Sequence, residues 1–191
     1  MPFKQFKDNV AVCFGVSFLV LFLLFYYFNI YFFGVTQAGN HYLPVLDDHF
    51  NYIRWLREGL LAASSLLLKA FGFTSIHNGY ELLVVGHQRI VLVYSCLGLG
   101  VMSFFAAFVI TYPKKWKAKL AFLLAGLLSI QILNICRLVL LALYWDRTKA
   151  RIIDHHVIFD VLIYIFISAS LYLWVNNKAS NPDVKNRPVH L

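Results

Sequence analysis

The feature that most constrains the fold of this chain is a run of about 24 residues, Val10–Phe33, without a single charged side chain. As a helix it reaches about 36 Å, which exceeds the roughly 30 Å hydrocarbon core of a bilayer. Lys4 and Lys7 precede it, as in a signal sequence, but the apolar region is too long for one and no small-residue cleavage site follows cleanly. We therefore predict an uncleaved membrane anchor with a cytoplasmic N-terminus.

Three more apolar runs follow, separated by polar segments: Leu97–Tyr112, Leu120–Tyr144 and Val157–Val175. Hydrophobic residues make up 60% of the chain and charged residues 14%, whereas globular domains have roughly 45–50% and about 25%. The sequence therefore predicts an all-α polytopic membrane protein with about four transmembrane helices. A single integral membrane domain is expected over residues 1–175, followed by a disordered, basic cytoplasmic tail at 176–191.

The segment between the first two spans is more complex. Residues 34–53 are polar and turn-rich, which is typical of an extracytoplasmic loop. Leu56–Phe73 is apolar but interrupted by charged and hydroxyl side chains, so it is either an amphipathic helix at the interface or a fifth span. Residues 81–94 contain two short β-branched runs around Gly86, a pattern that predicts a short outer β-hairpin.

The charges favour four spans, with Leu56–Phe73 at the interface. The N-terminus, the Lys114–Lys119 loop and the tail then share the cytoplasmic side and carry nine Lys/Arg and two acids, against seven and six on the longer outer segments. If Leu56–Phe73 spans instead, the lysine loop moves outside. We predict a multi-pass protein of the cytoplasmic (inner) membrane. Its net charge of +8 flanks the apolar runs, which favours membrane lipid and not nucleic acid as a partner.

Three polar residues from three different spans are expected at one depth. Cys96 lies at the outer start of Leu97–Tyr112, and His156 at the outer start of Val157–Val175. Arg137 follows Leu120 by 17 residues, or about 26 Å of helix, which places it near the outer edge of the same core. We therefore expect Cys96, Arg137 and His156 to meet on the extracytoplasmic side.

The surroundings of Cys96 favour a reactive thiol. Ser95 is expected to cap the helix that follows, and the positive end of the helix dipole favours the thiolate, which is the nucleophilic form. The other two cysteines, Cys13 and Cys136, fall inside apolar runs, where cysteine usually behaves as a small hydrophobe. The plain alternative for Cys96 is a structural cysteine near a helix start.

Polar supporting residues surround the other two positions. Gln131, Asn134 and Arg137 recur at i, i+3 and i+6, so they form a polar stripe on one helix face that is directed into the bundle. His155 and His156 are adjacent, and only one of them can point inward. Asp160 lies four residues after His156, where it either orients that imidazole or pairs with Arg137.

This set suits acyl transfer: a thiolate attacks a peptide carbonyl, histidine carries the proton to the leaving amine, and arginine stabilises the oxyanion. The chain resembles the exosortase/archaeosortase family of membrane-embedded cysteine transpeptidases. The resemblance lies in Ser95-Cys96-Leu97-Gly98, Asn134-Ile-Cys-Arg137 and Asp154-His-His156-Val-Ile-Phe-Asp160, in that order, over residues 80–175.

The resemblance implies a nucleophilic Cys96, a stabilising Arg137 and His156 as the third member, with Ser95, Asn134, His155 and Asp160 in support. It implies exported substrates with a C-terminal motif, a transmembrane helix and a basic cluster. No cofactor or metal is expected, since the histidines and cysteines lack tight ligand spacing. The alternative is a non-catalytic membrane assembly partner that docks another helix on the Gln131/Asn134/Arg137 stripe.

Overall fold

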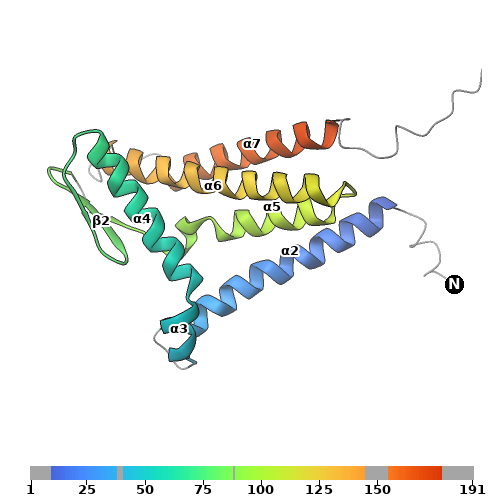
Figure 1. The fold of residues 1–191 in the computed structure, drawn as a ribbon, viewed down its shortest axis with the longest axis horizontal. Coiled ribbons are helices and arrows are strands. Elements are labelled where there is room, and N and C mark those ends of the chain that lie inside the picture. The colour runs from blue at the N-terminus through green and yellow to red at the C-terminus, as the bar shows by residue number, and fades with distance from the viewer. Residues whose placement is uncertain (1–9, 38–40, 88, 145–154, 178–191) are drawn as a thin grey trace, which may run out of the picture.

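A computed structural model describes residues 10–37, 41–87, 89–144 and 155–177, with the side chains of 10 and 155–158 left out. The described residues are mostly helical, which confirms the predicted all-α membrane fold. The helices are α2 (Val10–Val35), α3 (Pro44–Phe50), α4 (Tyr52–Ala70), α5 (Leu99–Thr111), α6 (Trp116–Tyr144) and α7 (His155–Asn176). In Figure 1, α5, α6 and α7 lie side by side, α2 runs obliquely along them, and α4 crosses one end.

The helices α2, α6 and α7 are long and apolar enough to cross a membrane, with apolar lengths of 25, 29 and 18 residues. The apolar helix α5 has only 13 residues, about 20 Å of rise, so by itself it falls short of the hydrocarbon core. The prediction of about four spans therefore corresponds, in the described part of the chain, to three long helices and the shorter α5.

Helix α4 is amphipathic. It buries a stripe of Ile53, Leu60, Leu61 and Leu68, spaced so that these residues share one helix face. It starts at Tyr52 and not at Leu56, because the Asn51 side chain caps it by accepting a hydrogen bond from the Arg54 amide at 2.9 Å. Since α4 crosses the end of the bundle (Figure 1), its placement favours the interfacial alternative over a fifth span.

Of two sequence predictions for the segments before the bundle, the first needs correction and the second is confirmed and extended. Residues 34–53 were expected to form a polar, turn-rich loop, but Pro44–Phe50 is helical, with Pro44 in the first turn, where the missing N–H costs nothing. The expected hairpin at 81–94 is confirmed: β2 (Glu81–Val84) pairs antiparallel with β3 (Ile90–Val91). It belongs to a three-stranded sheet in the order β1 (Ser75–His77), β2, β3. The sequence reading missed β1.

The sheet is held against α4 by one buried face. Leu82 and Val84 of β2 are fully buried, while Leu83 between them is exposed, which is the two-residue alternation of a half-buried strand. The Ser75 hydroxyl at the start of β1 hydrogen-bonds the Ser65 hydroxyl of α4 at 2.9 Å, and both side chains are buried. This polar contact explains why a strand with so little apolar surface joins the sheet.

The core has two parts. One cluster joins α4, the sheet and the ends of α5 and α6 that lie beside them, and it includes Cys96 and Leu97; we call this end of the molecule the sheet end. The other cluster lies between α5, α6 and α7, around the buried Phe105. Helix α2 packs on α5 mainly through aromatic rings, such as Phe18 against Phe104 with centroids 5.3 Å apart. Cys96 therefore lies where α4 and the sheet meet the helix bundle.

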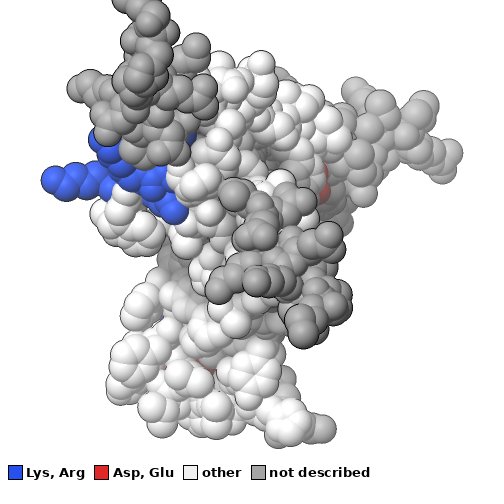
Figure 2. Space-filling view, turned by 90° about the vertical axis from the view of Figure 1, so that its right-hand side faces the viewer, with Lys and Arg blue, Asp and Glu red and all other residues white. Residues whose placement is uncertain are grey.

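The opposite end carries the lysines of the α5–α6 connection, and we call it the lysine end. Figure 2 looks onto it and shows the basic side chains gathered on one side. Lys114 is buried, lies 4.6 Å from the centroid of the Trp174 ring and donates a hydrogen bond to the Trp174 carbonyl. This cation therefore ties the connection to α7, while Lys115 and Lys117 are exposed.

Candidate active site

Cys96 lies in a single 3₁₀ turn, Tyr94–Leu97, between β3 and α5. Its side chain is 8% exposed and its amide donates to the Val93 carbonyl at 3.0 Å. The expected cap was wrong: Ser95 is exposed within this turn, and the cap of α5 is Gly98, which has no side chain to cap with. Cys96 therefore precedes the first turn of α5, and its chemistry depends on side chains from other helices.

Gly98 is the point where the turn becomes a helix. Its φ of 74° lies in the left-handed region, which glycine adopts without the cost that other residues incur. A Cβ added at Gly98 lies 2.7 Å from Asn134 Nδ2. The same amide donates to the Leu97 carbonyl at 3.3 Å, and Asn134 is 2% exposed. The close approach of α6 and the turn thus requires glycine at 98 and a short amide at 134.

Gln131 completes this contact. Its Nε2 lies 3.5 Å from the Leu97 carbonyl and 2.9 Å from Met102 Sδ, and its Oε1 accepts from Asn134 Nδ2 at 3.1 Å. The predicted polar stripe of α6 is therefore directed into the bundle and is engaged with groups of this chain. That arrangement leaves little polar surface with which the stripe can dock another helix.

We expect Gly98→Ala to destabilise the protein and impair its function. The left-handed backbone costs roughly 1–2 kcal/mol with a Cβ present, and Asn134 must also leave the Leu97 carbonyl. Gly100→Ala is the matched control, because a Cβ there meets only Tyr26 at 3.6 Å, an ordinary contact. Thermal unfolding in detergent measures both variants, and equal midpoints for the two would contradict this account of Gly98.

Arg137 joins Cys96 to α7. Its side chain is 5% exposed; Nη2 lies 3.5 Å from Cys96 Sγ, and Nη1 lies 3.3 Å from Asp160 Oδ1. The guanidinium also lies 5.9 Å from the Phe159 ring centroid. A planar guanidinium can hold two partners at once through different nitrogens. One end of Arg137 is thus fixed by the Asp160 carboxylate while the other faces the Cys96 thiol. Of the two alternatives for Asp160, the structure shows the contact with Arg137.

The third predicted member is placed only in part. His155 and His156 are the first two residues of α7, and their side chains lie outside the described residues. Asp160 follows His156 by one helical turn, on the same face. Since Asp160 contacts Arg137, the first turn of α7 starts close to the thiol–guanidinium contact.

The two other cysteines differ from Cys96. Cys13 and Cys136 are exposed, although Cys136 immediately precedes Arg137 in sequence. Successive residues of a helix point about 100° apart, so Cys136 faces outward while Arg137 faces the bundle. As to metals, the described residues contain no group of three or more His, Cys, Asp or Glu side chains close enough to hold an ion.

Sequence reasoning gave no role to Arg57, which is 4% exposed in α4. It was seen only as an interruption of the apolar segment. The signal was present, because Arg57 lies four residues after Ile53 and four before Leu61, on the apolar face of an amphipathic helix. A charge on that stripe predicts a buried cation.

Of the comparisons with known proteins, the one with family models found a match. The family model described as transmembrane exosortase matches residues 5–174, which includes the 3₁₀ turn, the polar stripe of α6 and all but the last two residues of α7. Neither a curated protein nor a solved structure matches. The match covers most of the chain and so includes residues 5–80, for which the sequence offered no specific motif.

Proposed function

Because the chain belongs to the transmembrane exosortase family, we propose that it is a membrane-embedded cysteine protease and transpeptidase. Its substrates are exported proteins that end in a short motif, a transmembrane helix and a basic cluster. It cleaves between motif and helix and transfers the acyl group to an acceptor. The observation that carries the proposal is the 3.5 Å contact of Arg137 Nη2 with the buried Cys96 Sγ, because it holds a cation beside the atom that would attack the substrate carbonyl.

The first half-reaction forms a thioester. The Cys96 sulfur attacks the carbonyl carbon of the scissile peptide bond, and the thiol proton passes to His156, the neighbour of His155. When the carbon–nitrogen bond breaks, His156 gives that proton to the leaving amine, which departs with the transmembrane helix of the substrate. Asp160 lies one turn after His156 on α7 and fixes the direction of the Arg137 guanidinium through its contact with it.

Arg137 acts on the negative charge that develops. In the tetrahedral intermediate the carbonyl oxygen becomes an oxyanion, and a fixed guanidinium in a dry site stabilises it without reorganisation. Asn134 and Gln131 act as positioning residues, since they hold the Leu97 carbonyl and hence the turn that presents the thiol. In the second half-reaction an acceptor attacks the thioester, gives its proton to His156 and releases the Cys96 sulfur.

The proposed orientation places the sheet end outside the cytoplasmic membrane. The lysine end carries four lysines within six residues, and such clusters are retained on the cytoplasmic side. The N-terminus and residues 176–191 would be cytoplasmic as well. In this orientation Cys96 and Arg137 meet a substrate only after its export.

A test of the covalent step uses hydroxylamine as the acceptor. The purified chain is mixed with an exported protein from the same genome that carries a motif–helix–basic tail. We expect hydroxylamine to attack the Cys96 thioester and release the substrate as a hydroxamate, which mass spectrometry identifies at the cleavage site. Cleavage that yields only a free carboxylate at every hydroxylamine concentration would contradict a thioester route.

A further inference from the structure

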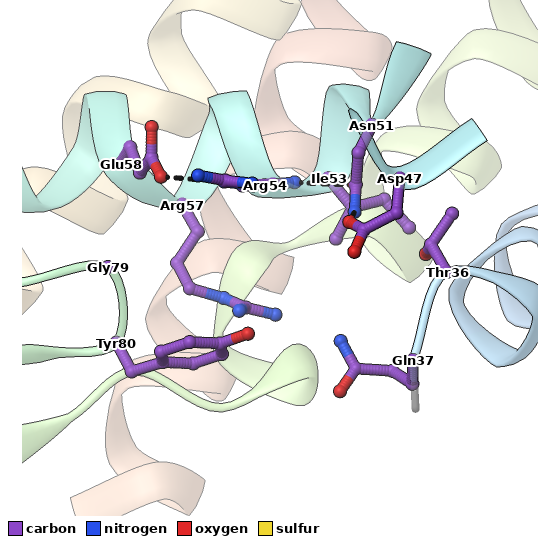
Figure 3. A pocket seen from close by; sticks show the side chains of 10 residues that line it. All are labelled: Thr36, Gln37, Asp47, Asn51, Ile53, Arg54, Arg57, Glu58, Gly79 and Tyr80. Carbon is purple, nitrogen blue, oxygen red and sulfur yellow. Dashed lines mark hydrogen bonds and ion pairs between the residues drawn. The ribbon is translucent and has the colours of Figure 1, made fainter. Parts of the chain in front are cut away.

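A cavity of about 260 Å³ lies at the sheet end, apart from Cys96. Its walls come from the end of α2, from α3, from the first two turns of α4 and from the β1–β2 turn, as Figure 3 shows. The side chains that matter for its chemistry are Gln37, Asp47, Arg54, Arg57, Glu58 and Tyr80. A space of this size holds more than one ordered water and is large enough for a small ligand group.

Arg57 is directed into this cavity from α4 (Figure 3). Its guanidinium carbon lies 4.4 Å from the Tyr80 ring centroid. Its Nε is buried and makes no hydrogen bond to any described residue, and no ion pair links Arg57 to an acid in the described ranges. A buried guanidinium without an anion is costly to maintain, so its retention points to a ligand that supplies the anion.

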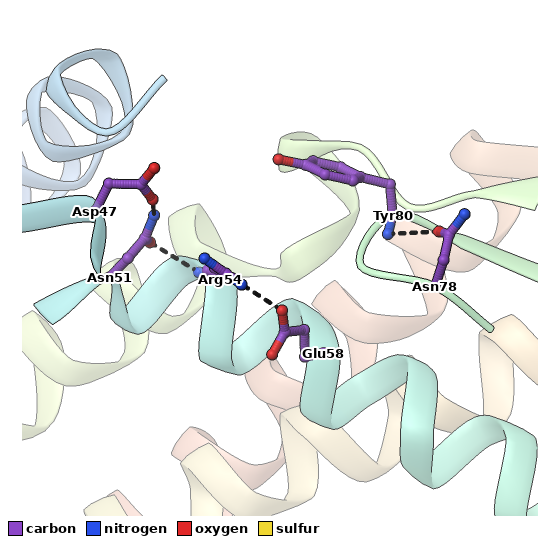
Figure 4. A network of polar contacts seen from close by, with 6 residues as sticks. All are labelled: Asp47, Asn51, Arg54, Glu58, Asn78 and Tyr80. Carbon is purple, nitrogen blue, oxygen red and sulfur yellow. Dashed lines mark hydrogen bonds and ion pairs between the residues drawn. The ribbon is translucent and has the colours of Figure 1, made fainter. Parts of the chain in front are cut away.

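The acids beside Arg57 are engaged elsewhere. Figure 4 shows Glu58 paired with Arg54, with Oε1 3.0 Å from Nε, and Asp47 bound by the Asn51 amide at 2.7 Å. Tyr42 also donates to Asp47 at 2.8 Å. These hydrogen bonds, first from Asn51 and then from Tyr42, lower the pKa of Asp47, so it is ionised at neutral pH. The cavity thus offers one guanidinium for a ligand, with two carboxylates already in its wall.

This charge pattern selects the ligand. A guanidinium fork fits a carboxylate through two parallel hydrogen bonds. A phosphate monoester carries nearly two negative charges, for which one cation is too few, and Asp47 and Glu58 would repel it. A singly charged carboxylate suits the site better, with Tyr80 beneath the guanidinium and the Gln37 amide on the facing wall (Figure 3).

We propose that the Arg57 cavity is a binding site for a single carboxylate group. It is joined to the Cys96 turn by short rigid contacts: the Leu92 amide donates to the Tyr80 carbonyl at 2.8 Å, and the Tyr94 ring packs on Phe33 of α2 with centroids 4.4 Å apart. The carboxylate comes either from an acidic side chain of a polypeptide bound at Cys96 or from a small free carboxylate. The first source rests on the proposed function, whereas the site itself does not.

The binding test uses acetate as the probe, with chloride and inorganic phosphate at equal ionic strength. We expect 100 mM acetate to raise the unfolding temperature of the full-length chain in detergent by about 2–4 °C more than that of Arg57→Gln. In chloride, Arg57→Gln should unfold no lower than the wild type, because it removes a buried unpaired charge. Arg57→Lys should lose most of the acetate effect, and Arg89→Gln, which changes an exposed arginine outside the cavity, should keep it.

Three results would overturn the proposal: equal acetate effects in wild type and Arg57→Gln, a larger effect of phosphate than of acetate, or a strongly lowered stability of Arg57→Gln in chloride. A second measurement, processing of a tailed substrate, identifies the source of the carboxylate. A raised KM in Arg57→Gln indicates the substrate, and unchanged processing with the acetate effect retained in the wild type indicates a free carboxylate. Cys96→Ala should bind acetate like the wild type, so this site and the proposed activity fail or succeed separately.

Discussion

Replacing Cys96 with alanine is expected to reduce processing of a tailed substrate by at least roughly 10³-fold while leaving the chain folded in the membrane. The size of the loss reflects the removal of the nucleophile, after which only binding and oxyanion stabilisation remain. The fold should tolerate the change because Cys96 and alanine are both small and the surrounding cluster is aliphatic. Appearance of the cleaved substrate in cells, followed by immunoblot, measures the rate.

The other cysteines provide matched controls. Cys13→Ala and Cys136→Ala each remove a thiol that is exposed on a helix, and both variants should process at the wild-type rate. Loss of processing in Cys136→Ala together with activity in Cys96→Ala would make Cys136 the nucleophile. Because Cys136 is exposed on α6, that result would contradict the proposed site. Cys96→Ser replaces the thiol with a hydroxyl and should be nearly as inactive as Cys96→Ala, because an alkoxide forms far less readily than a thiolate.

Much of the fold was predictable because long apolar runs leave few alternatives. The runs that became α2, α6 and α7 exceed what a protein of this size buries, so length and composition determined them. The meeting of Cys96 and Arg137 was also predictable, since 17 residues of helix from Leu120 fix the depth of Arg137. That estimate needed no knowledge of how the helices pack.

What sequence reasoning missed depends on tertiary contacts. The strand β1 is held by the hydrogen bond between the Ser75 and Ser65 hydroxyls. The residue types in Ser75–His77 do not by themselves predict a strand. The cap of α5 was assigned to Ser95 by the usual preference for a hydroxyl, but the approach of Asn134 to the Leu97 carbonyl requires a glycine with positive φ at 98. In both places the local structure depends on a contact with another segment of the chain. Rules based on neighbouring residues therefore gave the wrong result.

Arg137 is the second residue whose loss should be severe, and the choice of substituent separates charge from geometry. Arg137→Gln is expected to lower kcat by about 10²–10³-fold, the usual effect of removing one stabiliser of an oxyanion. Arg137→Lys keeps the charge but places it on a single nitrogen, which cannot reach both Cys96 Sγ and Asp160 as the two guanidinium nitrogens do. We expect it to recover only part of the activity.

A purely structural role for Arg137 makes a different prediction. In that case Arg137→Gln would lower the unfolding temperature and the activity together, and the alkylation of Cys96 by iodoacetamide would become faster as the site loosens. If Arg137 instead stabilises the oxyanion of the intermediate, kcat should fall in Arg137→Gln while the unfolding temperature and the alkylation rate of Cys96 stay near their wild-type values. Asp160→Asn supplies the comparison: its carboxylate is half exposed, so its removal should cost little stability. The effect on activity should then be smaller than that of Arg137→Gln, because the guanidinium remains beside the thiol but loses the anchor that fixes its direction.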